Sequence, residues 1–303
     1  MTASKIKFDI DCLDIVIARN CQLNCRGCIT FSDHNLVKGY TKINDSLAWL
    51  EFWSSKLKPK TLHLFGGEPL MHPELLEWVK QTNKFFNHTI NIQTNGINIK
   101  SIPHKELSEM IWNYNVNFSI SLHSQEQWYN EKIEQAVKTI TDIIGDGVWS
   151  QVGPATKYYV GKHEHSLTLN DTSELGWVSH YKGFGSSLAP GNNFESNQFN
   201  KSHDYCEAKP FIQLYNGALY KCPPLAVLDD TLSKYNYPNK DMWQPWLDYK
   251  PLTINSSDSE IASWLDKQAK PERYCNMCFG VQGSTIAHKM KVKLVNDNRQ
   301  PNC

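Results

Sequence analysis

The first half of the chain alternates short apolar runs with longer amphipathic stretches, and this alternation limits the fold more than any other feature. Apolar, β-branched runs predict strands, whereas apolar residues at three- and four-residue spacings predict helices. The predicted strands are 13–18, 61–65, 89–93 and 116–122, and the predicted helices are 42–57, 73–86, 104–113 and 125–145. Strands and helices that alternate in this way form successive βαβ units, so we predict an α/β fold around a parallel sheet.

The pattern weakens beyond residue 146. The stretches 150–160 and 175–182 are interpreted as a fifth and a sixth strand, and the Gly-, Ser- and Asn-rich stretch 183–202 as a linker. These boundaries rest on composition more than on periodicity, because neither stretch alternates cleanly between apolar and polar residues.

The sequence changes character after residue 206. An Asn-Gly pair at the centre of 211–222 predicts a β-hairpin, and loops with one short helix near 258–267 follow it. We therefore expect two domains, a larger one over 1–200 and a smaller, cysteine-bearing one over 201–303.

Charge and hydropathy exclude several classes of partner. Lysine plus arginine and aspartate plus glutamate each total 31, so the formal net charge is zero, which argues against nucleic acid. No stretch approaches the roughly 20 consecutive apolar residues of a membrane span. The N-terminal residues lack the apolar core of a signal peptide, so we expect a cytoplasmic protein without a membrane partner. Nine cysteines, an odd and high total for such a compartment, suggest metal ligands rather than a purely disulfide framework.

Polar or thiol-bearing residues follow each of the four predicted strands. In chain order they are Cys21, Cys25 and Cys28; Gly66, Gly67 and Glu68; Thr94 and Asn95; and Ser121. The carboxyl ends of parallel strands meet at one edge of a sheet, and sites in α/β folds gather there. We therefore expect these residues to face a common cavity.

The cysteine triplet has a specific chemical use. Three thiolates can hold three irons of a cubane [4Fe–4S] cluster and leave the fourth iron open. The two glycines of 66–69 let a ligand approach bare backbone, and the Glu68 carboxylate suits an ammonium group. Taken alone, 66–69 and 94–96 are also typical of tight turns.

Together these motifs resemble the radical S-adenosylmethionine (radical SAM) superfamily. CxxxCxxC follows the first strand, GGEP the second and IQTNG the third, and the resemblance extends from residue 13 to about residue 125. It implies a partial (β/α)6 barrel and a cluster whose open iron binds the amino and carboxylate groups of SAM. One electron from the reduced cluster then cleaves SAM to a 5′-deoxyadenosyl radical, which takes a hydrogen atom from the substrate.

The resemblance also implies a role for each motif residue. It implies Cys21, Cys25 and Cys28 as cluster ligands; Gly66, Gly67 and Glu68 at the methionyl ammonium; and Thr94, Asn95 and Ser121 at the carboxylate and ribose. Two positions depart from the family pattern. Many relatives have an aromatic residue where this chain has Gly27, a role that Phe31 could share, and His123 replaces an aspartate that is common after the fourth strand.

A second cysteine group lies in the C-terminal third. Cys206 and Cys222 flank the predicted hairpin, and Cys275 and Cys278 form a CxxC pair. The spacing resembles the shortened "twitch" extension of radical SAM enzymes, which implies one auxiliary [4Fe–4S] cluster with four thiolate ligands. Structural zinc is the rival interpretation, because all-cysteine zinc sites also use CxxC pairs.

Two clusters of this kind favour an oxidoreductase or a maturase. A fully ligated auxiliary cluster is suited to accepting an electron, so we expect a two-electron oxidation, either a dehydrogenation or an oxidative bond formation. We expect the substrate to be a small polar metabolite or a peptide, and the electron donor to be a flavodoxin or a ferredoxin. A ribosomal-peptide maturase and a non-catalytic iron–sulfur or zinc binding protein remain as alternatives.

A few further residues have no assigned chemistry. Cys12 and Cys303 are interpreted as thiols without a chemical role. His163 and His165 would share one face of a strand and could bind a metal, but a solvated loop is the preferred interpretation. Four aromatic residues could line the substrate cavity, although we expect them to pack in the core: Tyr158, Tyr159, Trp177 and Tyr181.

Overall fold

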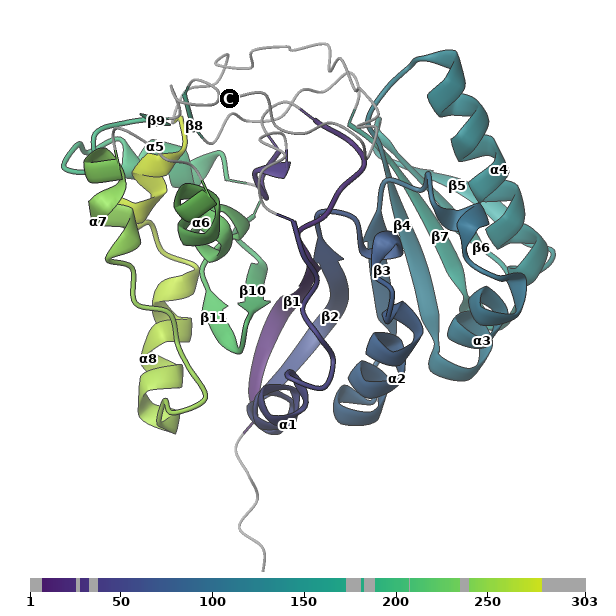
Figure 1. Cartoon of the computed structure of the whole chain (residues 1–303), viewed down its shortest axis with the longest axis horizontal. Helices are drawn as coiled ribbons and strands as arrows, with labels where there is room; N and C mark the ends of the chain where they lie inside the picture. Colours follow the sequence, from purple (N-terminus) through teal and green to yellow (C-terminus); the bar gives the residue numbers. More distant parts are fainter. Residues whose placement is uncertain are drawn as a thin grey trace, which may run out of the picture.

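The computed structural model describes residues 7–25, 28–32, 38–172, 181–182, 189–206, 208–234 and 240–279. Most of its strands belong to one sheet, in the order β11-β10-β1-β2-β3-β4-β7-β6-β5 (Figure 1). None of the helices in these residues has the length and apolar character that a bilayer crossing requires.

Six neighbouring strands of this sheet run parallel, which confirms the predicted α/β class. They are β10 (Phe211–Tyr215), β1 (Phe8–Ala18), β2 (Leu57–Gly66), β3 (Ile90–Thr94), β4 (Val116–Leu122) and β7 (Ser166–Asp171). Antiparallel strands extend both edges: β11 (Ala218–Tyr220) beside β10, and β6 (Thr156–Val160) and β5 (Val148–Val152) beyond β7.

Four helices connect the first strands at the predicted places, and Figure 1 shows them along the outside of the sheet. They are α1 (Leu47–Lys56), α2 (Leu75–Phe86), α3 (His104–Tyr114) and α4 (Gln127–Ile144). Their apolar faces, with Trp53, Trp78 and Ile140 fully buried, form one core with every second residue of the parallel strands. The strand residues between point to the opposite face of the sheet, and many of them are polar.

The fifth predicted strand is wrong. Residues 150–160 contain a turn at Gly153 (φ +69°), which folds β5 back on β6 in an antiparallel hairpin. The fifth parallel strand in chain order is β7, whose sequence SLTLND received no prediction. Of the predicted strand 175–182, the structure describes only Tyr181–Lys182, which as β8 pairs with β9 (Ala189–Pro190); residues 183–188 of the predicted linker also lie outside the described residues.

The predicted hairpin is confirmed. Asn216 (φ +47°) and Gly217 (φ +80°) form its turn between β10 and β11, as an Asn-Gly pair favours. β10 pairs in parallel with β1, so the hairpin continues the main sheet (Figure 1). The division of the chain at residue 200 stays a prediction.

The C-terminal third contains more helix than predicted. The helices are α5 (Phe199–Asp204), α6 (Pro223–Lys234), α7 (Gln244–Leu247) and α8 (Asp258–Gln268), and short 3-10 turns occur at Pro69–Met71, Ile99–Ser101, Lys162–Glu164, Lys240–Trp243 and Arg273–Met277. The 12-residue α6 was missed because two prolines open it, but prolines are acceptable in a first helical turn. Its apolar side chains form a second core cluster with Val16, Phe31 and Tyr215.

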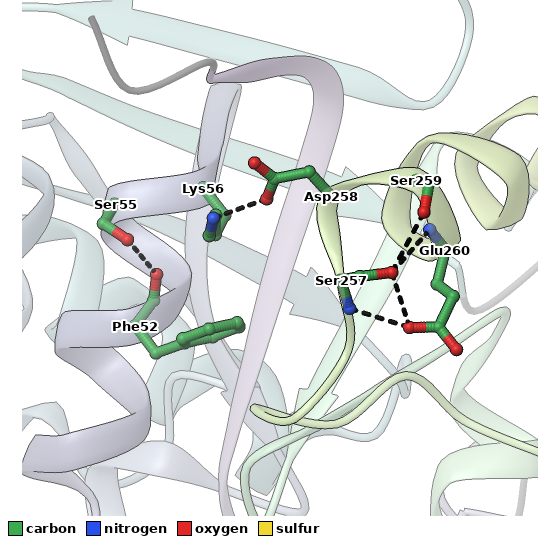
Figure 2. A network of polar contacts seen from close by, with 7 residues as sticks. All are labelled: Phe52, Ser55, Lys56, Ser257, Asp258, Ser259 and Glu260. Atoms are coloured by element: carbon green, nitrogen blue, oxygen red, sulfur yellow. Dashed lines mark hydrogen bonds and ion pairs between the residues drawn. The ribbon is translucent and has the colours of Figure 1, made fainter. Parts of the chain in front are cut away.

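The N-terminus of α8 is capped as its sequence dictates (Figure 2). The Ser257 hydroxyl accepts from the Glu260 amide, and the Glu260 carboxylate accepts from the Ser257 amide, a reciprocal capping box. The next residue, Asp258, pairs with Lys56 at the end of α1. This ion pair links the last long helix to the first.

Candidate functional site

The cysteine triplet lies in the loop that leaves the carboxyl end of β1. The Cys28 amide donates to the Cys25 carbonyl (3.1 Å), and the Phe31 amide donates to the Cys28 carbonyl (2.9 Å), so two successive turns bring the thiols together. All three cysteines line one cavity of about 180 Å³.

The residues predicted at the ends of the other strands line the same cavity, with one exception. The cavity contacts Gly66 and Gly67 after β2, Thr94 and Asn95 after β3, and Ser121 and His123 at the end of β4. Residues far apart in the sequence thus converge at one edge of the sheet.

The exception is Glu68. Its side chain is fully buried and is not among the residues that line the cavity. The carboxylate accepts hydrogen bonds from the Thr94 hydroxyl (2.6 Å), the Asn95 amide (2.8 Å) and the Leu70 amide (2.9 Å). Burial raises the pKa of Glu68 to about 7, while these hydrogen bonds oppose the rise. In this position the Glu68 carboxylate holds the turn after β3 and does not face the cavity.

The two glycines bring β2 and the cysteine loop into close contact. A Cβ on Gly66 would lie 2.1 Å from the Ala18 carbonyl oxygen, and one on Gly67 would lie 2.3 Å from the Asn20 carbonyl oxygen. The Gly67 amide donates to the Ala18 carbonyl (2.8 Å). Because Gly66 and Gly67 have no side chains, the backbone of the cysteine loop can pack directly against them at the edge of the cavity.

Asn95 connects the turn after β3 to the cysteine loop. Its Nδ2 lies 3.7 Å from the Cys21 sulfur, and its Oδ1 accepts from Gln22 Nε2 (2.9 Å). The Leu23 amide also donates to the Cys21 sulfur (3.4 Å). Burial raises the pKa of the Cys21 thiol, and these two hydrogen bonds oppose that rise. Cysteine ligates metals as the thiolate.

Tyr129, from the first turns of α4, was missed by the sequence analysis. Its fully buried hydroxyl lies within hydrogen-bonding distance of the Asn95 carbonyl (3.2 Å), the Ser121 carbonyl (3.0 Å) and the His123 amide (3.2 Å). Tyr129 thus fixes the ends of β3 and β4 relative to each other. The amphipathic pattern of 125–145 indicates only that this residue is buried.

The two departures from the family pattern have different outcomes. His123 lines the cavity, and burial lowers its pKa to about 4, so the ring is neutral at neutral pH. Phe31 packs into the second core cluster and does not line the cavity, so it does not replace the missing aromatic residue. Gly27 lies outside the described residues.

The second cysteine group also converges. Cys206, Cys222, Cys275 and Cys278 line one enclosed cavity of about 40 Å³, which they share with His203. The Nε2 atom of His203 is buried and has no hydrogen-bond partner among the described residues. Next to Cys222, the Lys221 ammonium donates to the carbonyls of Gln268 (2.7 Å) and Lys270 (2.9 Å), which ties the hairpin to the end of α8.

Neither cysteine group has the close spacing of a single-ion site. Among the described residues, the one set of three Cys, His, Asp or Glu ligand atoms within 4.8 Å of one another is Cys12, Asp14 and His63. Thiolates at about 2.3 Å from one tetrahedral Zn²⁺ are about 3.8 Å apart. The cysteine sulfurs are therefore more widely spaced than a lone zinc ion requires.

A third cavity, of about 450 Å³, connects the two cysteine sites. It shares Phe65, Gln93 and Ser121 with the triplet cavity. It shares Cys206 and Cys278 with the four-cysteine cavity. The rest of its lining combines polar side chains, among them Asp14, His63, Asn170 and Thr172, with less polar ones, Tyr205, Ala208, Phe211 and Pro223.

The remaining predicted residues lie elsewhere. His163 is exposed, as a solvated loop predicts, but His165 is buried against Trp112 with ring centroids 4.8 Å apart, so that prediction is wrong for His165. Tyr159 packs in the core. Cys12 is buried, and Tyr158 on β6 does not line any of the three cavities described above. Trp177, Cys303 and the side chain of Tyr181 lie outside the described residues.

A family model matches the first half of the chain. Residues 15–144 match the family model of the radical SAM superfamily, whereas no curated protein matches the chain. Among solved structures, the chain is similar to BtrN in complex with AdoMet and 2-DOIA, with a TM-score of 0.47 and 13% identity over 90% of this chain and 94% of that chain.

It is also similar to polyhistidine-tagged anSMEcpe with bound AdoMet, with a TM-score of 0.34 and 19% identity over 45% of this chain and 41% of that chain. Similarities this distant carry no argument about chemistry. The family match covers the triplet and every strand-end motif that lines its cavity. Residues 15–144 are thus similar to the radical SAM superfamily, whose members bind a [4Fe–4S] cluster and SAM.

Proposed function

We propose that this protein is a radical SAM oxidoreductase with two [4Fe–4S] clusters that oxidises a small polar molecule. The observation that carries the proposal is the 450 Å³ cavity, which touches both cysteine sites and whose mixed lining includes several polar side chains of the inner sheet face. A substrate in this cavity lies between a site that generates radicals and a site that accepts electrons.

The residues of the first site fit the cluster and SAM. Cys21, Cys25 and Cys28 supply three ligands around an accessible cavity, and the Leu23 amide and Asn95 Nδ2 lie within hydrogen-bonding distance of the Cys21 sulfur. The loaded site would supply hydrogen-atom abstraction by a 5′-deoxyadenosyl radical. A flavodoxin or ferredoxin is the proposed electron donor.

The chain's own residues bind and orient SAM in this proposal. The backbone of Gly66 and Gly67 meets the methionyl ammonium, and Thr94, Asn95 and Ser121 contact the carboxylate and ribose. Glu68 acts one step away, because its carboxylate holds the Thr94 hydroxyl and the Asn95 amide in place. We therefore assign Glu68 a positioning role in place of direct contact with the ammonium.

The four-cysteine site supports a second cluster over zinc for two reasons. No three of its sulfurs lie within 4.8 Å of one another, although all four residues are described. The four cysteines also line, together with His203 and other residues, a cavity of about 40 Å³, which is larger than the roughly 10–15 Å³ that one water needs. Cys206, Cys222, Cys275 and Cys278 are the proposed ligands.

The polar inner face supports a small polar substrate. A barrel interior is ordinarily filled by branched apolar side chains. Here Asp14, His63, Gln93 and Asn170 come from four different strands and line one cavity. Polar groups placed around a cavity give orientation and specificity to a small ligand. A peptide, as in a ribosomal-peptide maturase, is the alternative substrate.

Iron analysis and SAM cleavage test the proposal. Anaerobic reconstitution should give about eight irons per chain, and dithionite should then drive release of 5′-deoxyadenosine. Four irons with one zinc would exclude the second cluster. Eight irons without any SAM cleavage would favour a non-catalytic iron–sulfur protein.

Two matched variants separate the sites. Replacing Cys21, Cys25 and Cys28 with alanine should abolish SAM cleavage and leave about four irons per chain. Replacing the four C-terminal cysteines should also leave about four irons, but SAM cleavage should persist. Loss of cleavage in the second variant, with its fold retained, would contradict the proposed division of roles.

A further inference from the structure

A row of polar side chains crosses three neighbouring strands on the inner face of the sheet. Asp14 on β1 is in register with His63 on β2 and with Gln213 on β10. All three are buried, with exposed fractions of 4%, 6% and 0%. A buried carboxylate next to a buried imidazole is costly unless the two are paired, so their placement needs a reason.

Asp14 fixes the orientation of the His63 ring. Asp14 Oδ1 lies 2.8 Å from His63 Nδ1, and Asp14 Oδ2 accepts from Gln213 Nε2 (2.7 Å). An ionised carboxylate only accepts hydrogen bonds, so Nδ1 of His63 carries the proton and donates it. The other ring nitrogen, Nε2, is left as an acceptor.

The His63 side chain lines the proposed substrate cavity. Both Asp14 and His63 line the 450 Å³ cavity. The side-chain amide nitrogen of Gln93 lies 3.4 Å from His63 Nε2. That distance is too long for a strong hydrogen bond, so a substrate hydroxyl can take its place.

We propose that His63, oriented by Asp14, is the base that takes the proton from the substrate hydroxyl during the oxidation. The inference rests on the proposed function. Oxidation of a carbinol to a carbonyl removes a hydrogen atom from carbon, a proton from oxygen and one electron. SAM and a cluster held at Cys21, Cys25 and Cys28 would supply the acceptor of the hydrogen atom, and an oxidised cluster held by the four C-terminal cysteines would supply the acceptor of the electron. The proton goes to Nε2 of His63. The substrate class is therefore a small molecule with a secondary or primary hydroxyl group.

Histidine tautomers provide a test that needs no substrate. Nitrogen-15 NMR on the full-length, cluster-loaded protein in its resting state should show His63 protonated at Nδ1 and unprotonated at Nε2. Asp14→Asn should shift the ring towards a mixture of tautomers. A ring protonated at Nε2 in the wild type would overturn the proposal, as would a metal ion bound at Cys12, Asp14 and His63.

Deuterium transfer provides the second test. The probe is a polar extract of cells grown on deuterated glucose, given to the loaded enzyme with SAM and dithionite. Wild type should transfer deuterium into 5′-deoxyadenosine and deplete one metabolite, whose product is lighter by one deuterium and one hydrogen. No transfer at all would reject the proposed function, and this inference with it.

The variant comparison isolates the proton step. His63→Gln should still transfer deuterium, but its ratio of product to 5′-deoxyadenosine should fall at least about tenfold, because a general base typically contributes 10²–10⁴-fold. Asp14→Asn should lower the ratio less. His88→Gln, which changes a histidine just before β3 at the opposite end of the strands, should leave it unchanged. An unchanged ratio in His63→Gln, with deuterium transfer intact, would reject His63 as the base and leave the proposed function standing.

Discussion

Several side chains around the triplet cavity act mainly by holding the backbone of neighbouring turns in position. Glu68 is the clearest case, since three donors from the turns after β2 and β3 converge on its buried carboxylate. Because burial raises its pKa from 4.5 to about 7, the folded state binds this proton more tightly than the unfolded state does. The resulting stabilisation is complete below pH 4.5 and is lost as the pH rises through about 7.

Glu68→Gln should remove this pH dependence. Between about pH 5 and about pH 8, the free energy of unfolding of the wild type should fall by about 2 kcal/mol relative to that of the variant. Urea unfolding of both proteins at the two pH values measures the difference. A constant difference across this range would mean that the Glu68 pKa is not raised in the folded state.

Gly67 permits a close approach between the cysteine loop and the residues that follow β2. Gly67→Ala would place a Cβ 2.3 Å from the Asn20 carbonyl oxygen, so the loop must move. We expect a stability loss of about 1–3 kcal/mol and reduced iron retention at the triplet after gel filtration. The control is Gly153→Ala in the β5–β6 turn, where open space surrounds the new Cβ and only the positive φ is strained. It should lose some stability but no iron.

The residues of local motifs could be predicted from the sequence. The residues that contact these motifs from distant parts of the chain could not. Cys21, Gly67 and Asn95 could be named because each stands in a recognisable local pattern. Tyr129 and His63 could not, because their roles depend on which strands pair and in which register. Glu68 was identified, but nothing local indicates that three hydrogen bonds already converge on its carboxylate.

Helices and turns were predicted correctly where a short stretch of sequence contains the whole signal for them. The capping box of α8 and the Asn-Gly turn of the hairpin are both read directly from short sequences. β7 was missed because its sequence SLTLND is only partly alternating, and α6 because its two prolines resemble a loop. Tertiary contacts, namely pairing of β7 with β4 and burial of α6, decide these two elements.

The cap of α8 gives a prediction at this scale (Figure 2). Ser257→Ala removes the acceptor for the Glu260 amide and should destabilise the protein by about 1 kcal/mol in urea unfolding. Ser108→Ala, at a half-buried position in the middle of α3, should be neutral or slightly stabilising, because alanine favours helix interiors. Equal losses in the two variants would show that the cap contributes no specific stabilisation.

For the whole molecule, the sheet crosses the predicted domain boundary. β10 pairs with β1 along Cys12–Ile15, and Trp53 of α1 donates to the Gly217 carbonyl of the hairpin turn (2.9 Å). Apolar residues of α6 bury Val16 and Phe31 next to the cysteine loop. The proposed electron-accepting site is thus attached to the strand that carries the radical-generating site, and the cavity between them depends on both.

A chain of residues 1–200 should therefore not fold as a stable unit. It would expose the β1 edge that β10 covers and the apolar surface under α6, and an unpaired, apolar edge promotes aggregation. We expect the truncated chain to aggregate or to lose cooperative unfolding, whereas the full chain should unfold in one main transition. Trp53→Phe in the full chain is the control, because it removes the hydrogen bond to Gly217 and part of a buried ring but leaves the strand pairing in place. It should cost about 2–4 kcal/mol without loss of cooperative unfolding. A soluble 1–200 fragment that unfolds cooperatively and binds four irons would instead establish the boundary at residue 200 as a true domain division.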